Sequence, residues 1–189
     1  MLSRRILRVK VVKAVYAHLQ TESDNIPATE KNLVSSIDKA YDLYFHILSL
    51  LPELVKYAEA RQEIARNKML PTEEDLNPNR KFVENRAIER IASCQAINDY
   101  CAKRGMKWSE NSDLIKNLYN ILTEQSFYKS YMNNSSRSFK EDTELAANIL
   151  LNILELNEQL EGVLEDQSIF WVDDLGYVLT MAARTVTSM

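Results

Sequence analysis

The chain has 189 residues, of which 46% are hydrophobic, but only three are glycine and four are proline. Because glycine makes up about 7% of an average protein, this shortage excludes a turn-rich β-sandwich or barrel and a glycine-rich loop that binds nucleotide phosphates. The net charge of −4 excludes a polycation that coats nucleic acid over its whole surface, so any nucleic-acid binding must be local.

Apolar residues recur at helical spacing along the whole chain, which predicts an all-α bundle of six or seven helices without strands. The first helix is expected from Ser3 to Gln20. Its buried stripe is expected to contain Leu7, Val11, Ala14, Val15 and His18. After a break around Pro27, the next helical pattern runs from Thr29 towards Met69, and Pro52 either kinks this helix or restarts it.

The clearest linker is the proline-containing segment 70–79. We therefore treat residues 1–189 as one all-helical region with a possible subdivision into 1–70 and 80–189. The last helix has no glycine stop and no polar tail after it, which is expected if the chain is the N-terminal part of a longer protein.

Further helices are expected at residues 80–103, 113–132, 138–160 and 175–186. Gly105 supplies a stop signal after the first of these. Ser138 and Glu141 have the spacing of a capping box at the start of the third. A break is expected from Gly162 to Ser168.

The sequence offers little support for catalysis, a metal or a cofactor. His18 and His46 lie among core positions with no nucleophile nearby in the sequence. Asp173 and Asp174 do not follow a known cation-binding loop and suit a helix start. We therefore expect a protein that is not an enzyme, with no cofactor and no metal.

The cysteines and the hydropathy pattern bear on the cellular compartment. Cys94 and Cys101 are seven residues apart in a helical pattern, which favours reduced thiols on one helix face over a disulfide framework. No secretory signal and no run of eighteen apolar residues is present. We therefore expect a cytoplasmic protein without a membrane span.

The basic N-terminal cluster is the strongest functional signal. Five basic residues precede the first acid, and they are Arg4, Arg5, Arg8, Lys10 and Lys13. The start of a helix carries the positive end of its dipole and normally favours acids, so local stability does not explain this arrangement. Arg4, Arg5 and Arg8 project within an arc of about 100°, which suits one phosphate-rich ligand.

A weaker signal lies at residues 127–137, where aromatic and basic residues alternate. This segment contains Phe127, Tyr128, Lys129, Tyr131 and Arg137. Such a pattern can stack and neutralise single-stranded RNA, but it is more typical of core aromatics at a helix end.

The segment from Arg4 to Tyr16 resembles the N-terminal signature of the NusB family of transcription antitermination factors. Paired arginines are followed by Arg8, a small residue, an aliphatic residue and Tyr16. The resemblance covers about residues 3–20 and is closer to long family members that carry a helical insertion after this helix. The family's C-terminal hallmark is absent, which suggests that the second NusB bundle is missing.

The resemblance implies a transcription antitermination or elongation factor. It implies binding of boxA-type single-stranded RNA together with NusE, a ribosomal protein, in the antitermination complex of RNA polymerase. Arg4, Arg5 and Arg8 match the family's arginines. Lys10 lies at a less uniform position, and we include it as a fourth expected RNA contact.

Two other functions remain open. The first is a helical protein-interaction or scaffold module without nucleic-acid binding, in which acids such as Glu22, Asp38 or Asp42 neutralise the first-helix arginines. The second is an RNA-binding appendage of a ribosomal RNA methyltransferase, whose catalytic part would lie outside this chain.

Overall fold

The structure is a computed structural model, and it describes residues 2–21 and 24–189. Within these ranges the chain forms ten α-helices and one π-helical segment, η1, and no strand. The all-α prediction is confirmed, but the helices are more numerous than the six or seven expected. Their bounds are α1 Arg4–Gln20, α2 Ile26–Arg66, α3 Glu73–Leu76, α4 Arg86–Ala92, α5 Gln95–Arg104, α6 Ser112–Glu124, α7 Ser126–Asn133, α8 Phe139–Ile149, η1 Leu150–Leu154, α9 Glu158–Gln167 and α10 Trp171–Thr187.

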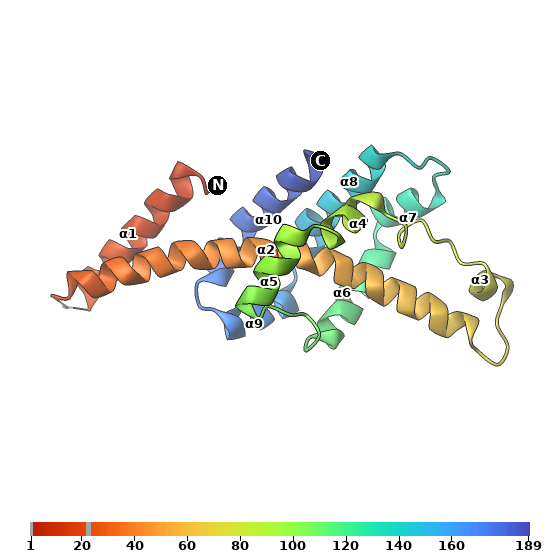
Figure 1. The fold of residues 1–189 in the computed structure, drawn as a ribbon, viewed down its shortest axis with the longest axis horizontal. Helices are drawn as coiled ribbons and strands as arrows, with labels where there is room; N and C mark the ends of the chain where they lie inside the picture. Colours follow the sequence, from red (N-terminus) through yellow and green to blue (C-terminus); the bar gives the residue numbers. More distant parts are fainter. Residues whose placement is uncertain (1, 22–23) are drawn as a thin grey trace.

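Helix α2 is the central element of the molecule (Figure 1). It has 41 residues, which corresponds to a length of about 60 Å. The Asn25 side chain caps it by accepting a hydrogen bond from the backbone N–H of Ala28 at 3.1 Å. Pro52 lies inside the helix without ending it, so one continuous helix replaces the two segments that the proline allowed.

The hydrophobic core forms around the middle of α2, where buried residues extend from Ala40 to Ala58. This helix contributes completely buried side chains, including Leu43, Ile47 and Leu54, and contacts α1, α3, α4, α5, α6 and α10. Buried residues such as Phe82 and Leu179 belong to the same core. The core therefore includes residues from both sides of the segment 70–79, within which Thr72 caps the short helix α3.

Several expected long helices are interrupted. The pattern at 80–103 divides into α4 and α5 at Ser93 and Cys94, so Cys94 and Cys101 do not share a helix; both are free thiols. The pattern at 113–132 divides at Gln125, whose backbone is extended. Apolar spacing continues across these short breaks, which explains why the sequence did not reveal them.

The C-terminal half contains two further corrections. Ser138 caps α8 by accepting from the Glu141 backbone N–H at 3.2 Å, but the Glu141 carboxylate accepts a hydrogen bond from Asn134 at 2.6 Å. Only half of the expected capping box is therefore present. The expected break from Gly162 to Ser168 is shorter in the structure, because Gly162 lies inside α9 and the helix continues to Gln167. The chain leaves the helix at Ser168, and α10 begins at Trp171.

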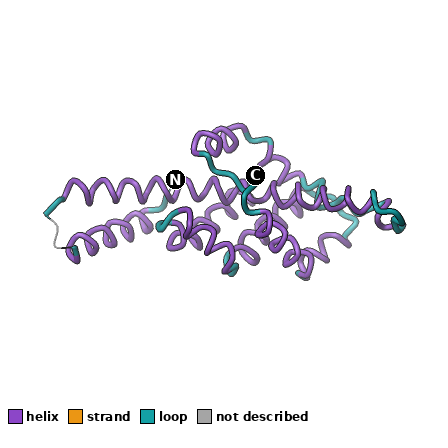
Figure 2. The backbone as a smooth tube through the Cα atoms, turned by 90° about the horizontal axis from the view of Figure 1, so that it is seen from below, coloured by secondary structure: helices purple, strands orange, loops and turns teal. Residues whose placement is uncertain are grey.

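Helix α1 and the first part of α2 form an antiparallel pair that extends away from the rest of the bundle (Figure 2). The start of α10 lies beside this pair. In the described ranges, no helix has the length and hydrophobicity needed to cross a membrane.

Candidate nucleic-acid interface

The three N-terminal arginines are free and exposed in the structure. Among the described residues, the side chains of Arg4, Arg5 and Arg8 make no hydrogen bond or ion pair, and all three lie in solvent. The first turn of α1 contains no acid that could neutralise them. Their positions on the helix place them within an arc of about 100°, so three guanidinium groups face the same side.

The two lysines that follow are held by acids. Lys10 Nζ lies 2.6 Å from Asp174 Oδ2, and both side chains are about 95% buried. Lys13 Nζ lies 2.7 Å from Asp173 Oδ2 at the surface. The expectation that Lys10 contacts RNA is therefore not retained, because its ammonium group is buried and paired.

The same contacts explain the acidic pair near the C-terminus. Asp173 and Asp174 lie in the first turn of α10, where the helix dipole favours acids, and they attach α1 to α10. Ser3 adds a third connection, because its backbone N–H donates to the Tyr177 hydroxyl at 2.8 Å.

Helix α1 exposes most of its apolar residues. Val12, Val15, Tyr16 and Leu19 are 67%, 51%, 64% and 70% exposed, respectively, whereas Lys10 is the one buried residue of this helix. The expected burial of Val11 and Val15 is therefore wrong. We call the surface formed by Arg4, Arg5, Arg8, Val12, Val15, Tyr16 and Leu19 the outer face of α1.

The outer face has two parts. At 100° per residue its members lie within an arc of about 120°, with the arginines at the N-terminal end and the apolar residues after them. Exposed apolar side chains that gather on one helix face are typical of an interaction surface. The exposed apolar residues could have been predicted from the sequence. A helix that buries one face needs apolar residues on that face alone, whereas α1 has them on other faces as well.

The histidines do not form a catalytic arrangement. His18 Nδ1 lies 2.9 Å from Thr29 Oγ1 and connects the ends of the α1–α2 pair. His46 is fully buried and stacks on Trp108 with ring centroids 3.9 Å apart. Burial lowers the pKa of His46 to about 4, and the Gln167 side chain acts in the opposite direction. In the described ranges, His, Cys, Asp and Glu form no group of three or more suited to a metal ion.

The alternating aromatic and basic segment has a structural role. Tyr128 and Tyr131 are buried in the core. Lys129 pairs with Glu124 at 3.1 Å, so this cation is not free for phosphate.

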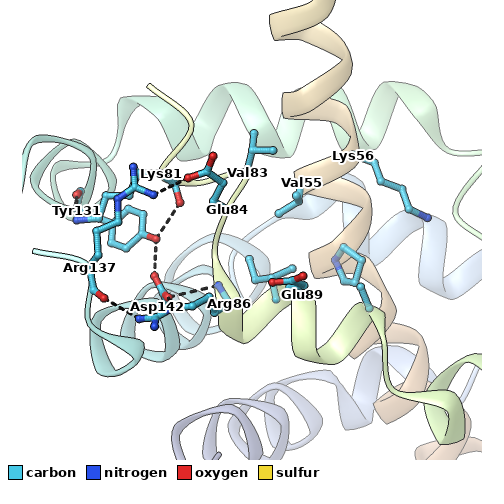
Figure 3. Close-up of a pocket in the computed structure, with 13 residues that line it drawn as sticks. Val55, Lys56, Lys81, Val83, Glu84, Arg86, Glu89, Tyr131, Arg137 and Asp142 are labelled. Atoms are coloured by element: carbon cyan, nitrogen blue, oxygen red, sulfur yellow. Dashed lines mark hydrogen bonds and ion pairs between the residues drawn. The ribbon is translucent and has the colours of Figure 1, made fainter. Parts of the chain in front are cut away.

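A cavity of about 610 Å³ lies next to this segment, between α2, α4 and the start of α8 (Figure 3). Among the described residues, Glu89 makes no ion pair, whereas the other charged side chains that line the cavity are paired. Arg137 lies 2.6 Å from Glu84, which holds the pKa of this carboxyl below its usual value, and Arg86 lies 3.1 Å from Asp142.

The buried Lys81 beside this cavity is also satisfied. Its ammonium donates to the carbonyls of Tyr131 and Asn134 at 2.7 and 2.8 Å. Asp142 accepts from the Tyr131 hydroxyl at 2.7 Å. This network fixes the α7–α8 connection against α4 and leaves the free arginines of α1 as the better candidate site.

Protein-family models, curated proteins and solved structures contain no match to this chain. The function is therefore argued from the outer face of α1 and from the resemblance of its sequence to the NusB signature.

Proposed function

We propose that this chain is a cytoplasmic RNA-binding protein of NusB type, in which Arg4, Arg5 and Arg8 contact the phosphates of a boxA-type single-stranded RNA. The observation that carries the proposal is that these arginines are exposed and unpaired while the next two lysines on the same helix are neutralised. Exposed guanidinium groups on one helix side suit phosphate oxygens. The role is one of binding and not of catalysis.

The apolar part of the outer face supports a protein partner beside the RNA. Val12, Val15, Tyr16 and Leu19 follow the arginines directly and have no cover in the structure. In the NusB resemblance this partner is NusE, within the antitermination complex of RNA polymerase. RNA and partner would then occupy adjacent parts of one helix.

The scaffold alternative required that acids neutralise the arginines. Asp42 is buried and interacts with Lys39, Arg104 and the Tyr100 hydroxyl. Asp38 is exposed and makes no ion pair in the described ranges. Glu22 lies outside the described residues. The free arginines therefore favour RNA binding over the scaffold module.

The test is binding of a boxA-like single-stranded RNA at several salt concentrations, with and without NusE. Three phosphate contacts predict a slope of log affinity against log salt of about −2, from about −0.7 per contact for single strands. Replacement of Arg4, Arg5 and Arg8 by glutamate should remove binding and its salt dependence.

A control variant separates specific contacts from net charge. Arg66 in α2, Lys107 in the connection between α5 and α6, and Lys116 in α6 are exposed. Their replacement by glutamate changes the net charge by the same amount. This variant should retain most of the affinity. Equal losses in both variants would mean that overall charge, and not the outer face of α1, determines binding.

A further inference from the structure

A groove lies between α1 and α2, next to the free arginines. It has a volume of about 520 Å³ and is lined by Leu2, Leu7, Ile37, Asp38 and Tyr41. Because α1 and α2 are antiparallel and Arg4 lies three residues before Leu7, Arg4 is at the rim of this groove. Arg8 lies about one turn after Arg4 on the outer face of α1.

The ring of Tyr41 is held in place by other aromatic rings. It contacts Phe45 edge-on at a centroid distance of 5.4 Å and lies 6.2 Å from Tyr100. Tyr100 stacks on Phe45 at 4.2 Å, and its hydroxyl donates to the buried Asp42 at 2.8 Å. Tyr41 nevertheless remains 39% exposed, so a fixed aromatic surface faces solvent in the groove.

Asp38 adds a hydrogen-bond acceptor to the same groove. It lies three residues before Tyr41, and side chains at this spacing are neighbours on a helix surface. Asp38 is exposed, and its carboxylate makes no hydrogen bond or ion pair in the part of the chain that the structure describes. A carboxylate accepts two parallel hydrogen bonds, and the Watson–Crick edge of guanine presents two parallel N–H donors.

We propose that this groove is a base-binding subsite for a guanine of the bound RNA, in which the base stacks on Tyr41 and donates its N1 and N2 hydrogens to Asp38. The inference rests on the proposed function, because Arg4 beside the groove and Arg8 one turn further along α1 would hold the adjacent phosphates. Adenine presents one exocyclic donor on this edge, and uracil presents one imino donor, so both fit the carboxylate less well. Single-stranded RNA is recognised in this way, by stacking of unpaired bases and by hydrogen bonds to their edges.

The test uses the whole chain and short uridine-rich RNAs that contain one guanine, one inosine or one adenine at the same position. Inosine keeps N1–H and lacks the N2 amine. We expect about tenfold tighter binding of the guanine RNA than of the adenine RNA, with inosine between them, as for a bidentate base contact. Asp38→Asn should remove most of this preference, whereas Asp99→Asn, which changes an exposed acid in α5, should leave it intact.

Stacking is tested with a second set of variants. Tyr41→Leu should weaken binding of all three RNAs about tenfold without changing the salt slope, because the phosphate contacts remain. Tyr41→Phe keeps the ring and should retain affinity. A 2-aminopurine placed at the variable position should lose fluorescence on binding to the wild-type chain and less on binding to Tyr41→Leu.

The outcomes distinguish the subsite from the proposed function. RNA binding with the expected salt slope, but without base preference and without an effect of Tyr41→Leu, would overturn the subsite and leave the arginine contacts. Absence of RNA binding by the wild-type chain, with NusE present, would overturn both.

Discussion

Lys10 shows that the packing of α1 is unusual at the level of single residues. Its charged side chain is buried against Asp174, while Val12 and Leu19 on the same helix are largely exposed. In a buried ion pair, the attraction between the two charges offsets the free-energy cost of removing them from water only while both partners are present. The stability of the α1 attachment therefore depends on a pair whose members are 164 positions apart.

Lys10→Met should lower the free energy of unfolding by about 3–5 kcal/mol, because Asp174 would remain buried without a partner. The double variant Lys10→Met with Asp174→Leu should recover most of this loss. Urea denaturation of the two variants and the wild type measures both effects. A loss below about 1 kcal/mol in the single variant would mean that the pair is hydrated in solution.

His46 predicts a pH dependence of stability. Burial lowers its pKa to about 4 in the folded chain, whereas an unfolded chain protonates this imidazole near pH 6.5. Between these two values the unfolded state binds the additional proton, so stability falls as the pH decreases, by about 3 kcal/mol across the window.

The comparison that isolates this effect is between the wild type and His46→Phe, which keeps a ring against Trp108 but cannot be protonated. When the pH is lowered from neutral to about 4.5, the urea midpoint of unfolding should decrease more in the wild type than in the variant. Parallel decreases would assign the acid sensitivity to the carboxylates instead.

At the level of elements, the effects of a glycine-to-alanine substitution can be compared at Gly105 and Gly162. A Cβ at either position would meet no atom within 4 Å, but Gly105 has a φ of +67° at the end of α5, whereas Gly162 lies inside α9. Gly105→Ala should destabilise the chain by about 1 kcal/mol because of the left-handed backbone. Gly162→Ala should stabilise it by about 0.5–1 kcal/mol. The melting temperature should fall in Gly105→Ala and rise in Gly162→Ala. Shifts in the same direction would contradict this explanation.

Helix boundaries with a local chemical cause could be predicted from the sequence. Ser3 starts α1 and Gly105 ends α5, as expected, because capping groups act on neighbouring backbone atoms. Helix α2 instead begins at Ile26 after its Asn25 cap, three residues before the expected Thr29, and Pro27 lies in its first turn. The breaks at Cys94 and Gln125 have no side-chain cap, so packing against distant elements determines them, and the sequence gives no local sign of it.

The same distinction applies to the candidate site. The clustering of Arg4, Arg5 and Arg8 follows from helical spacing and could be predicted. The burial of Lys10 could not, because it depends on how α10 packs against α1. The groove at Tyr41 likewise requires the antiparallel placement of α1 and α2.

At the scale of the whole molecule, stability is unevenly distributed. α1 contributes no residue to the hydrophobic core and is attached through ion pairs and the contacts of Ser3 and His18. Regions with few buried apolar contacts open locally before the rest.

Amide hydrogens of α1 should therefore exchange faster than those of α8 or α10. Added salt should increase the exchange rate of the α1 amides further, because it screens the exposed Lys13–Asp173 pair. Hydrogen exchange measured by mass spectrometry tests this directly. Binding of RNA to the outer face should slow the exchange of α1. Protection of α1 equal to that of α10 in the free protein would contradict the unequal distribution.

The length of α2 also affects how the molecule moves in solution. At about 60 Å this one helix exceeds the diameter of about 40 Å expected for a sphere with this number of residues. The resulting frictional drag makes a monomer of 21.8 kDa elute early from a sizing column, at the volume of a larger globular protein. Its oligomeric state must therefore be read from light scattering or sedimentation equilibrium, which report mass independently of shape.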